Sequence, residues 1–169
     1  SDIRSIIIKP PRSRTDEDIQ YLIKAFKEGD FFSTIDILHY IGEVVSILHY
    51  ESYCSEEIIV NEGDPADAFF IIIEGAVDIL KKLQNSLADI SDKISRLIPG
   101  QTIGETCLMN NCVRGCSAKC AKDTELIKIY KKDFAKIIER YKEKVSEDIN
   151  EIMANCGLFK GMSPSIIKK

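Results

Sequence analysis

The chain has 169 residues, of which 44% are hydrophobic and 30% charged, and its formal net charge is −4. This length allows one domain with extensions and suffices to bury a substantial core. The acidic balance argues against a nucleic-acid-binding surface, which needs a basic face. No apolar run approaches the roughly 20 residues of a membrane span, and Ser1–Arg4 lack the pattern of a secretory signal. We therefore expect a cytoplasmic protein.

The N-terminal segment predicts an extended stretch followed by one helix. Residues 5–14 read as extended, because the run Lys9-Pro10-Pro11 cannot continue a helix. Thr15–Asp18 has the composition of a capping box. The helix that follows carries its apolar residues on one face and ends at Gly29; these residues are Ile19, Leu22, Ile23 and Phe26. Residues 1–33 are thus expected to form an extension with a single helix.

A second helix is predicted where the main domain begins, near residue 34. Ser33 or Thr34 can cap it, and its apolar stripe consists of Ile37, Leu38, Ile41, Val44 and Val45. His39 and His49 lie in or just after this helix. No cysteine or serine in a nucleophile elbow accompanies them, so a catalytic triad is unsupported and both are interpreted as structural residues. The chain is not expected to be an enzyme.

The pattern changes to short apolar runs between about residues 47 and 130. The expected strands are Ile47–Tyr53, Glu57–Val60, Ala68–Glu74, Ala76–Lys82, Lys93–Ile98, Gln101–Gly104, Val113–Ala121 and Thr124–Tyr130. Turn residues at regular spacing favour an antiparallel β-barrel or jelly roll. Residues 83–93 are polar and are expected to form a loop. The turn Pro99-Gly100 predicts a hairpin between the two strands that flank it, and Lys122-Asp123 predicts that the last two strands close the same sheet.

Helical spacing returns after the last strand. Apolar positions at this spacing predict C-terminal helices over about residues 131–156, ending at Gly157. The fold class is therefore α+β: a barrel flanked by N-terminal helices and a C-terminal helical lid, with residues 34–156 as the main domain. Leu158–Ile167 echoes Phe31–Leu38, and residues 157–169 are interpreted as a hypothetical start of a second, truncated copy.

The most informative stretch is 103–118. It reads as a strand end, a glycine turn, one helical turn and a return strand that carries Arg114. Unpaired backbone N–H groups at the start of a helical turn favour an anion, and Arg114 can add a bidentate contact to the same anion. Glu105 can accept hydrogen bonds from hydroxyl groups. A phosphate beside a sugar would satisfy all three features.

These residues resemble the phosphate-binding cassette of cyclic nucleotide-binding domains. The cassette pattern is seen in Ile103-Gly104-Glu105-Thr106-Cys107-Leu108 and Val113-Arg114-Gly115-Cys116-Ser117, and a second landmark of the family is Glu62–Gly75. The resemblance covers about residues 34–155. It implies that Glu105 binds the ribose 2′-hydroxyl and that Arg114 pairs with the cyclic phosphate. The remaining expected ligand-binding positions are Gly104, Thr106, Cys107, Gly115 and Cys116.

The chain departs from the family pattern at four of its cassette positions. Ile103 replaces Phe, Cys107 and Cys116 replace Ala, and Gly115 replaces Ala or Thr. None of these changes adds a bulky or acidic group beside the phosphate. A hydroxyl residue after the arginine often favours guanine in the family, so Gly115 leans the expectation toward adenine.

The resemblance implies a sensor that binds cAMP or cGMP without another cofactor, moves its C-terminal helices, and acts on an effector domain or subunit of the same signalling pathway. One alternative is a domain of the same fold that acts as a ligand-free interaction scaffold. Another is a metal or redox module built on Cys107, Cys112, Cys116 and Cys120. Because Cys116 and Cys120 fall on one strand face, buried thiols fit that spacing better than zinc ligands. A further alternative is that Glu105 and Arg114 form a surface salt bridge.

Overall fold

The computed structural model describes residues 3–28, 41–83, 91–104 and 112–140. The chain forms two compact units, Ser1–Ala135 and Lys136–Lys169, and the architecture below concerns the first. Within the described ranges, no helix is long and apolar enough to cross a membrane. The cap of the second predicted helix, most of the C-terminal helices and the hypothetical second copy lie outside the described residues.

The N-terminal segment contains more helix than the sequence predicts. Helix α1 (Ile3–Ile7) and the 3-10 turn η1 (Pro11–Ser13) precede α2 (Asp16–Glu28). The expectation of an extended stretch over residues 5–14, with one helix in the whole extension, is therefore wrong. Ile6 and Ile7 are almost fully buried, and burial stabilises a five-residue helix that would be marginal in isolation.

The predicted capping box at the start of α2 is confirmed. The Asp18 backbone N–H donates to Thr15 Oγ1 at 3.2 Å, and the Thr15 backbone N–H donates to Asp18 Oδ2 at 3.0 Å. Lys9 Nζ also donates to Asp18, at 2.8 Å, and this hydrogen bond is the main reason that the pKa of Asp18 is lowered. The reciprocal bonds satisfy two backbone donors at the helix start.

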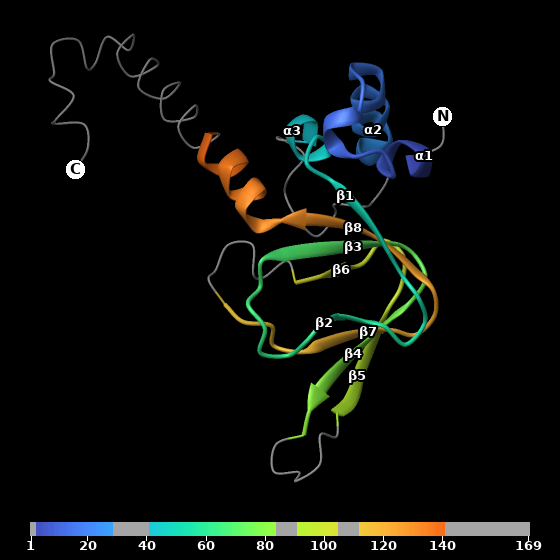
Figure 1. Ribbon diagram of the computed structural model, residues 1–169, viewed down its shortest axis with the longest axis vertical. Helices are drawn as coiled ribbons and strands as arrows, with labels where there is room; N and C mark the ends of the chain where they lie inside the picture. Colours follow the sequence, from blue (N-terminus) through green and yellow to red (C-terminus); the bar gives the residue numbers. More distant parts are fainter. Residues whose placement is uncertain (1–2, 29–40, 84–90, 105–111, 141–169) are drawn as a thin grey trace, which may run out of the picture. The chain divides into compact units, whose positions relative to one another are not determined.

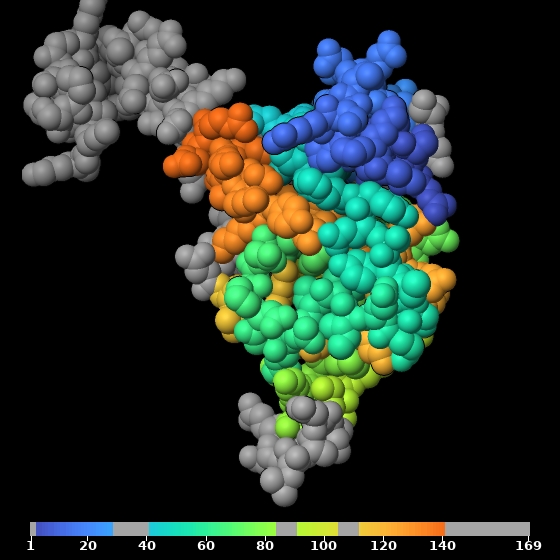
Figure 2. Space-filling model, viewed as in Figure 1, coloured from blue at the N-terminus to red at the C-terminus, as the bar shows by residue number. Residues whose placement is uncertain are grey.

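Arg14 fastens the N-terminal helices to the rest of the fold. Its guanidinium donates to the carbonyl oxygens of Ile6 and Ile7, where α1 ends, and to those of Val45 and Leu48. Val45 is the last residue of α3 (Ile41–Val45). One cation therefore satisfies the open carbonyl ends of two helices. Figure 2 shows the N-terminal residues, in blue, packed against the teal residues of this region.

Two antiparallel four-stranded sheets make up the barrel. The first has the order β1-β8-β3-β6, from β1 (His49–Tyr53), β8 (Thr124–Tyr130), β3 (Ala68–Glu74) and β6 (Thr102–Ile103). The second has the order β2-β7-β4-β5, from β2 (Ile58–Val60), β7 (Ser117–Cys120), β4 (Val77–Lys82) and β5 (Ser91–Leu97). The sheets face each other (Figure 1), which confirms the predicted jelly roll with flanking helices.

The predicted pairing of neighbouring strands is wrong in two places. β5 pairs with β4, whereas β6 pairs with β3 in the other sheet, so Pro99-Gly100 carries the chain between sheets and closes no hairpin. The Gly100 N–H donates to the Ile72 carbonyl at 2.8 Å and thereby docks this crossover on β3. β7 and β8 likewise lie in different sheets. Residues 91–93, predicted as loop, begin β5.

The main core lies between the two sheets. Its buried members come from five strands: Ala68, Phe70, Ile72, Val77, Ile103, Ala118 and Leu126. The opposite face of the first sheet is also buried, at Phe69, Ile71, Ile127 and Ile129, and Figure 1 shows the N-terminal helices on that side. Burial on both faces explains why β3 reads as a continuous apolar run.

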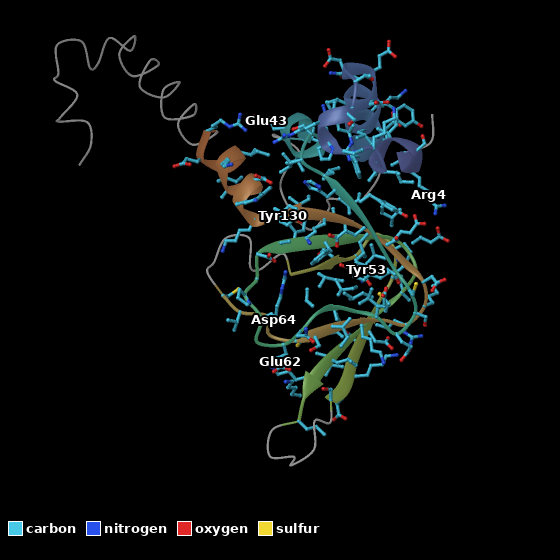
Figure 3. The ribbon with its side chains drawn as sticks, viewed as in Figure 1. Arg4, Glu43, Tyr53, Glu62, Asp64 and Tyr130 are labelled. Atoms are coloured by element: carbon cyan, nitrogen blue, oxygen red, sulfur yellow. The ribbon has the colours of Figure 1, made fainter. Side chains whose placement is uncertain are left out.

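A small polar network is enclosed with this core. Lys128 Nζ donates to Glu51 Oε1 at 2.9 Å, and Tyr53 donates its hydroxyl to Glu51 Oε2 at 2.7 Å. Figure 3 shows Tyr53 between the two sheets. Burial, followed by the hydrogen bond to Glu51, raises the pKa of Tyr53. The three half-buried groups satisfy one another's hydrogen bonds, as polar groups withdrawn from water usually do.

Candidate functional site

The loop between β2 and β3 positions the backbone of Arg114. The Gly63 N–H donates to the Arg114 carbonyl at 2.8 Å, and the Arg114 N–H donates to the Asp64 carbonyl at 2.8 Å. Pro65 forms an isolated antiparallel bridge with Val113. Figure 3 labels Glu62 and Asp64 in this loop. The two sequence landmarks, far apart along the chain, thus pair directly with each other.

The Arg114 side chain is buried beneath β3, with only 4% of its surface exposed. Its Nη2 donates to the Ala68 carbonyl at 2.5 Å, and its Cζ lies 5.8 Å from the centroid of the Phe70 ring. Among the described residues, the Asp67 carboxylate lies 3.9 Å from Nη2 and is largely exposed to solvent. A carbonyl dipole and a solvated carboxylate at that distance compensate the buried cation only in part.

Two nitrogens of this guanidinium are left without partners. Within the described parts of the chain, Arg114 Nε and Nη1 are buried and have no hydrogen-bond partner. Nη1 lies directly against Gly104, where an added Cβ would collide with it. Gly104 has a φ of +83°, a conformation that side chains rarely adopt. The glycine therefore lets the cassette backbone approach the arginine closely.

An open, mostly apolar pocket of about 690 Å³ adjoins this region. Its wall combines the segment just before β3, the residues just before Arg114, the end of β8 and the helical residues that follow it. The lining residues are Pro65, Ala66, Asp67, Cys112, Val113, Tyr130, Lys131, Lys132 and Ala135. Its size is in the range of small-molecule sites. Asp67 belongs both to this wall and to the surroundings of Arg114.

The structure brings together only some of the predicted site residues. Gly104 and Arg114 are in contact, and Gly115 and Cys116 follow the arginine in the bend that precedes β7, Cys116 half-buried. Glu105, Thr106 and Cys107 lie outside the described residues. The alternative of a surface salt bridge does not fit Arg114, because its guanidinium is buried.

The clustered cysteines show no shared geometry in the described part of the chain. Cys112 is exposed, Cys116 is half-buried and Cys120 is buried, while Cys54, outside the cluster, is exposed. Among the residues described, no group of three or more metal-binding side chains comes together. Burial raises the pKa of the Cys120 thiol, as expected for a packing residue.

Sequence reasoning missed the groups that surround Arg114. Ala68 and Phe70 were interpreted only as strand residues, and their contact with the arginine depends on the pairing of distant segments. It also missed Lys81 on β4, whose Nζ donates to the Gly115 carbonyl at 2.6 Å and to Glu62 Oε1 at 2.7 Å. No spacing in the sequence connects Lys81 with Glu62 and Gly115, so no local signal could have revealed these contacts.

Comparison with known proteins is consistent with this geometry. Residues 50–141, more than half of the chain, match the family described as "Cyclic nucleotide-binding domain". The chain is 23% identical to cGMP-dependent protein kinase 2 of Rattus norvegicus over 170 residues, which cover 95% of the chain and 21% of the kinase. The chain therefore spans about a fifth of that relative's length.

Two solved structures resemble the fold. The regulatory domain of Toxoplasma gondii PKA, crystallised with cAMP, superposes with a TM-score of 0.59 and 19% identity over 79% of this chain and 50% of that one. The regulatory subunit of a cAMP-independent protein kinase A from Trypanosoma brucei gives a TM-score of 0.56 and 15% identity over 80% and 51% of the two chains. At these identities the likeness establishes the fold alone.

Proposed function

This chain belongs to the cyclic nucleotide-binding domain family, and we propose that it binds cAMP or cGMP with Arg114 as the receptor for the cyclic phosphate. The domain is proposed to be regulatory and not catalytic. The rat relative is a cGMP-dependent kinase and the Toxoplasma structure contains cAMP, so both nucleotides are candidates. The lack of a hydroxyl at Gly115 favours adenine over guanine.

The observation that carries this proposal is the incomplete pairing of a buried arginine. A buried guanidinium with two unpaired nitrogens is costly, and an anion that accepts a hydrogen bond from the guanidinium would relieve part of that cost. Arg114 Nε and Nη1 have no partner in the described parts of the chain. A phosphate matches the planar, forked donor geometry of an arginine in a way that water or a single carbonyl does not.

The rest of the ligand is assigned to the cassette residues next to Gly104, the glycine that lies against Arg114. Glu105 follows Gly104 directly and is proposed to accept from the ribose 2′-hydroxyl. Occupancy of the site is proposed to shift the helices of residues 131–156 and so to regulate an effector domain or subunit. A ligand can shift such an equilibrium only by its difference in affinity for the two arrangements.

Calorimetric titration with cAMP and with cGMP tests this proposal. Arg114→Ala should weaken binding by about 2–5 kcal/mol, the usual effect of removing one partner of a buried charge pair. Arg96→Ala is the matched control, because Arg96 is an exposed arginine that pairs with Asp78 on the same barrel. If the native protein releases no heat with either nucleotide, the proposal is rejected.

The second candidate function is an interaction scaffold of the same fold without a nucleotide. The Trypanosoma brucei neighbour, described as cAMP-independent, makes this candidate specific. A scaffold should show no rise in melting temperature with cyclic nucleotides beyond that seen with AMP or GMP. A rise confined to the cyclic forms would exclude it.

A further inference from the structure

Lys81 connects the two segments that hold the phosphate-binding arginine. Its Nζ donates to Glu62 Oε1 at 2.7 Å and to the Gly115 carbonyl at 2.6 Å. Glu62 immediately precedes Gly63, which binds the Arg114 carbonyl, and Gly115 immediately follows Arg114. The Lys81 ammonium group therefore links the residue before Gly63 to the residue after Arg114.

Glu62 is fixed from three sides. Besides Lys81, its Oε2 accepts from the Lys82 backbone N–H at 2.9 Å, and its own backbone N–H donates to Ser117 Oγ at 2.9 Å. The hydrogen bond to Lys81 lowers the pKa of Glu62, and the same bond raises the pKa of Lys81. Both groups are thus charged at neutral pH, and the pair bridges β4 to the loop that binds Arg114.

Gly115 has no side chain to hold it in place. Among the described residues, no atom beyond its two chain neighbours lies within 4 Å of where its Cβ would be. The regular ladder of β7 begins only at Ser117. Lys81 therefore substitutes for a strand bond at the residue next to the arginine, where a shift in the backbone would move the guanidinium.

We propose that Lys81, held by Glu62, is a positioning residue that fixes the backbone after Arg114 and thereby sets the affinity of the site for the phosphate. This rests on the proposed function, because Lys81 acts on the ligand only through the arginine. Without Lys81, the Gly115 carbonyl would bind water. The backbone around Arg114 and Gly115 could then adopt orientations in which the guanidinium does not face the anion.

Three variants test the inference. Lys81→Met keeps the methylene chain and removes the charge, Lys81→Arg keeps a donor, and Glu62→Gln neutralises the partner of Lys81. Lys119→Met is the matched control, because Lys119 lies on β7 of the same sheet and its ammonium group pairs with Glu56 instead of Glu62. The melting temperature of each ligand-free variant shows whether it is folded.

The first measurement is calorimetric affinity for cAMP and cGMP. Losing one charge-assisted hydrogen bond should weaken both nucleotides about 10-fold in Lys81→Met. Glu62→Gln should weaken them less, Lys81→Arg should restore most of the affinity, and Lys119→Met should match the native protein. Equal affinities in Lys81→Met and Lys119→Met would overturn the inference.

The second measurement reports on the arginine without any ligand. The Nε–H signal of Arg114 in an NMR spectrum, assigned by its loss in Arg114→Lys, should exchange faster with solvent in Lys81→Met and should be unchanged in Lys119→Met. An unchanged signal, even with weakened binding, would show that Lys81 does not act through Arg114 and would refute its positioning role. If the native protein binds no nucleotide, the proposed function fails, while this comparison still decides whether Lys81 positions the arginine.

Discussion

Replacing Gly104 by alanine probes the close contact between the cassette backbone and Arg114. Two costs are expected. Alanine at a φ of +83° pays about 1–2 kcal/mol for the left-handed backbone. Its Cβ would also collide with Arg114 Nη1, so the guanidinium must move. That movement breaks the 2.5 Å bond to the Ala68 carbonyl, which is worth about 1.5–3 kcal/mol for a charged donor.

Gly100→Ala separates these two costs. Gly100 has a φ of +89°, and within the described part of the chain no atom beyond its two neighbours lies within 4 Å of its Cβ position, so alanine there adds backbone strain without a collision. In chemical denaturation, the free energy of unfolding should fall by about 1–2 kcal/mol in Gly100→Ala and by a further 1.5–3 kcal/mol or so in Gly104→Ala.

The nucleotide affinity should fall only where the added Cβ displaces Arg114, and backbone strain alone should leave it unchanged. Calorimetric titration should show native affinity in Gly100→Ala and a loss of about 10- to 100-fold in Gly104→Ala, which is the affinity equivalent of the displaced contact. If Gly104→Ala binds as tightly as Gly100→Ala, then the position of the guanidinium in this structure does not determine binding, and the reasoning is refuted.

Three further predictions concern the scaffold. Arg14→Met should lower the free energy of unfolding by about 2–4 kcal/mol, because four backbone carbonyls lose a charged donor; the exposed neighbour variant Arg12→Met should lower it far less, and equal losses would contradict the role of Arg14. Thr15→Ala should cost about 1 kcal/mol in the same denaturation assay through loss of the cap, and an unchanged midpoint would argue against it. Burial is the main cause that lowers the pKa of His49 below 6.5, so the folded state favours the neutral ring. The contribution of neutral His49 to the free energy of unfolding is therefore complete above pH 6.5 and is lost as the pH falls through the pKa of the folded state. His49→Gln should reduce the loss of stability between about pH 7.5 and 5.5, whereas an NMR titration midpoint for His49 at or above 6.5 would contradict this reasoning.

Local signals in the sequence predicted those parts of the fold that local physics decides. Thr15 and Asp18 form the expected capping box because both partners lie within one helical turn. Ala68–Glu74 and Thr124–Tyr130 are strands with the predicted bounds, since each is a dense apolar run between turn residues. The helix Ile3–Ile7 was missed because its stability comes from burial against the rest of the fold, which three consecutive isoleucines do not indicate.

Strand pairing and the surroundings of the site depended on long-range contacts. Pro99-Gly100 looks like a hairpin turn, but the bond from Gly100 to Ile72 directs the chain into the other sheet. Arg114 was identified from the cassette motif, whereas its burial and its bond to Ala68 come from a strand 46 positions away. Lys81 lies far from Arg114 in the sequence and belongs to no motif, so only the folded structure connects it with Gly115.

The central claim is that Arg114 receives the phosphate of a cyclic nucleotide. Crystals soaked with cAMP and, in parallel, with cGMP test it most directly. We expect electron density in which phosphate oxygens lie about 2.8 Å from guanidinium nitrogens of Arg114, with the ribose beside Glu105. Density for the nucleotide elsewhere, or a barrel without nucleotide density under both soaks, would contradict it.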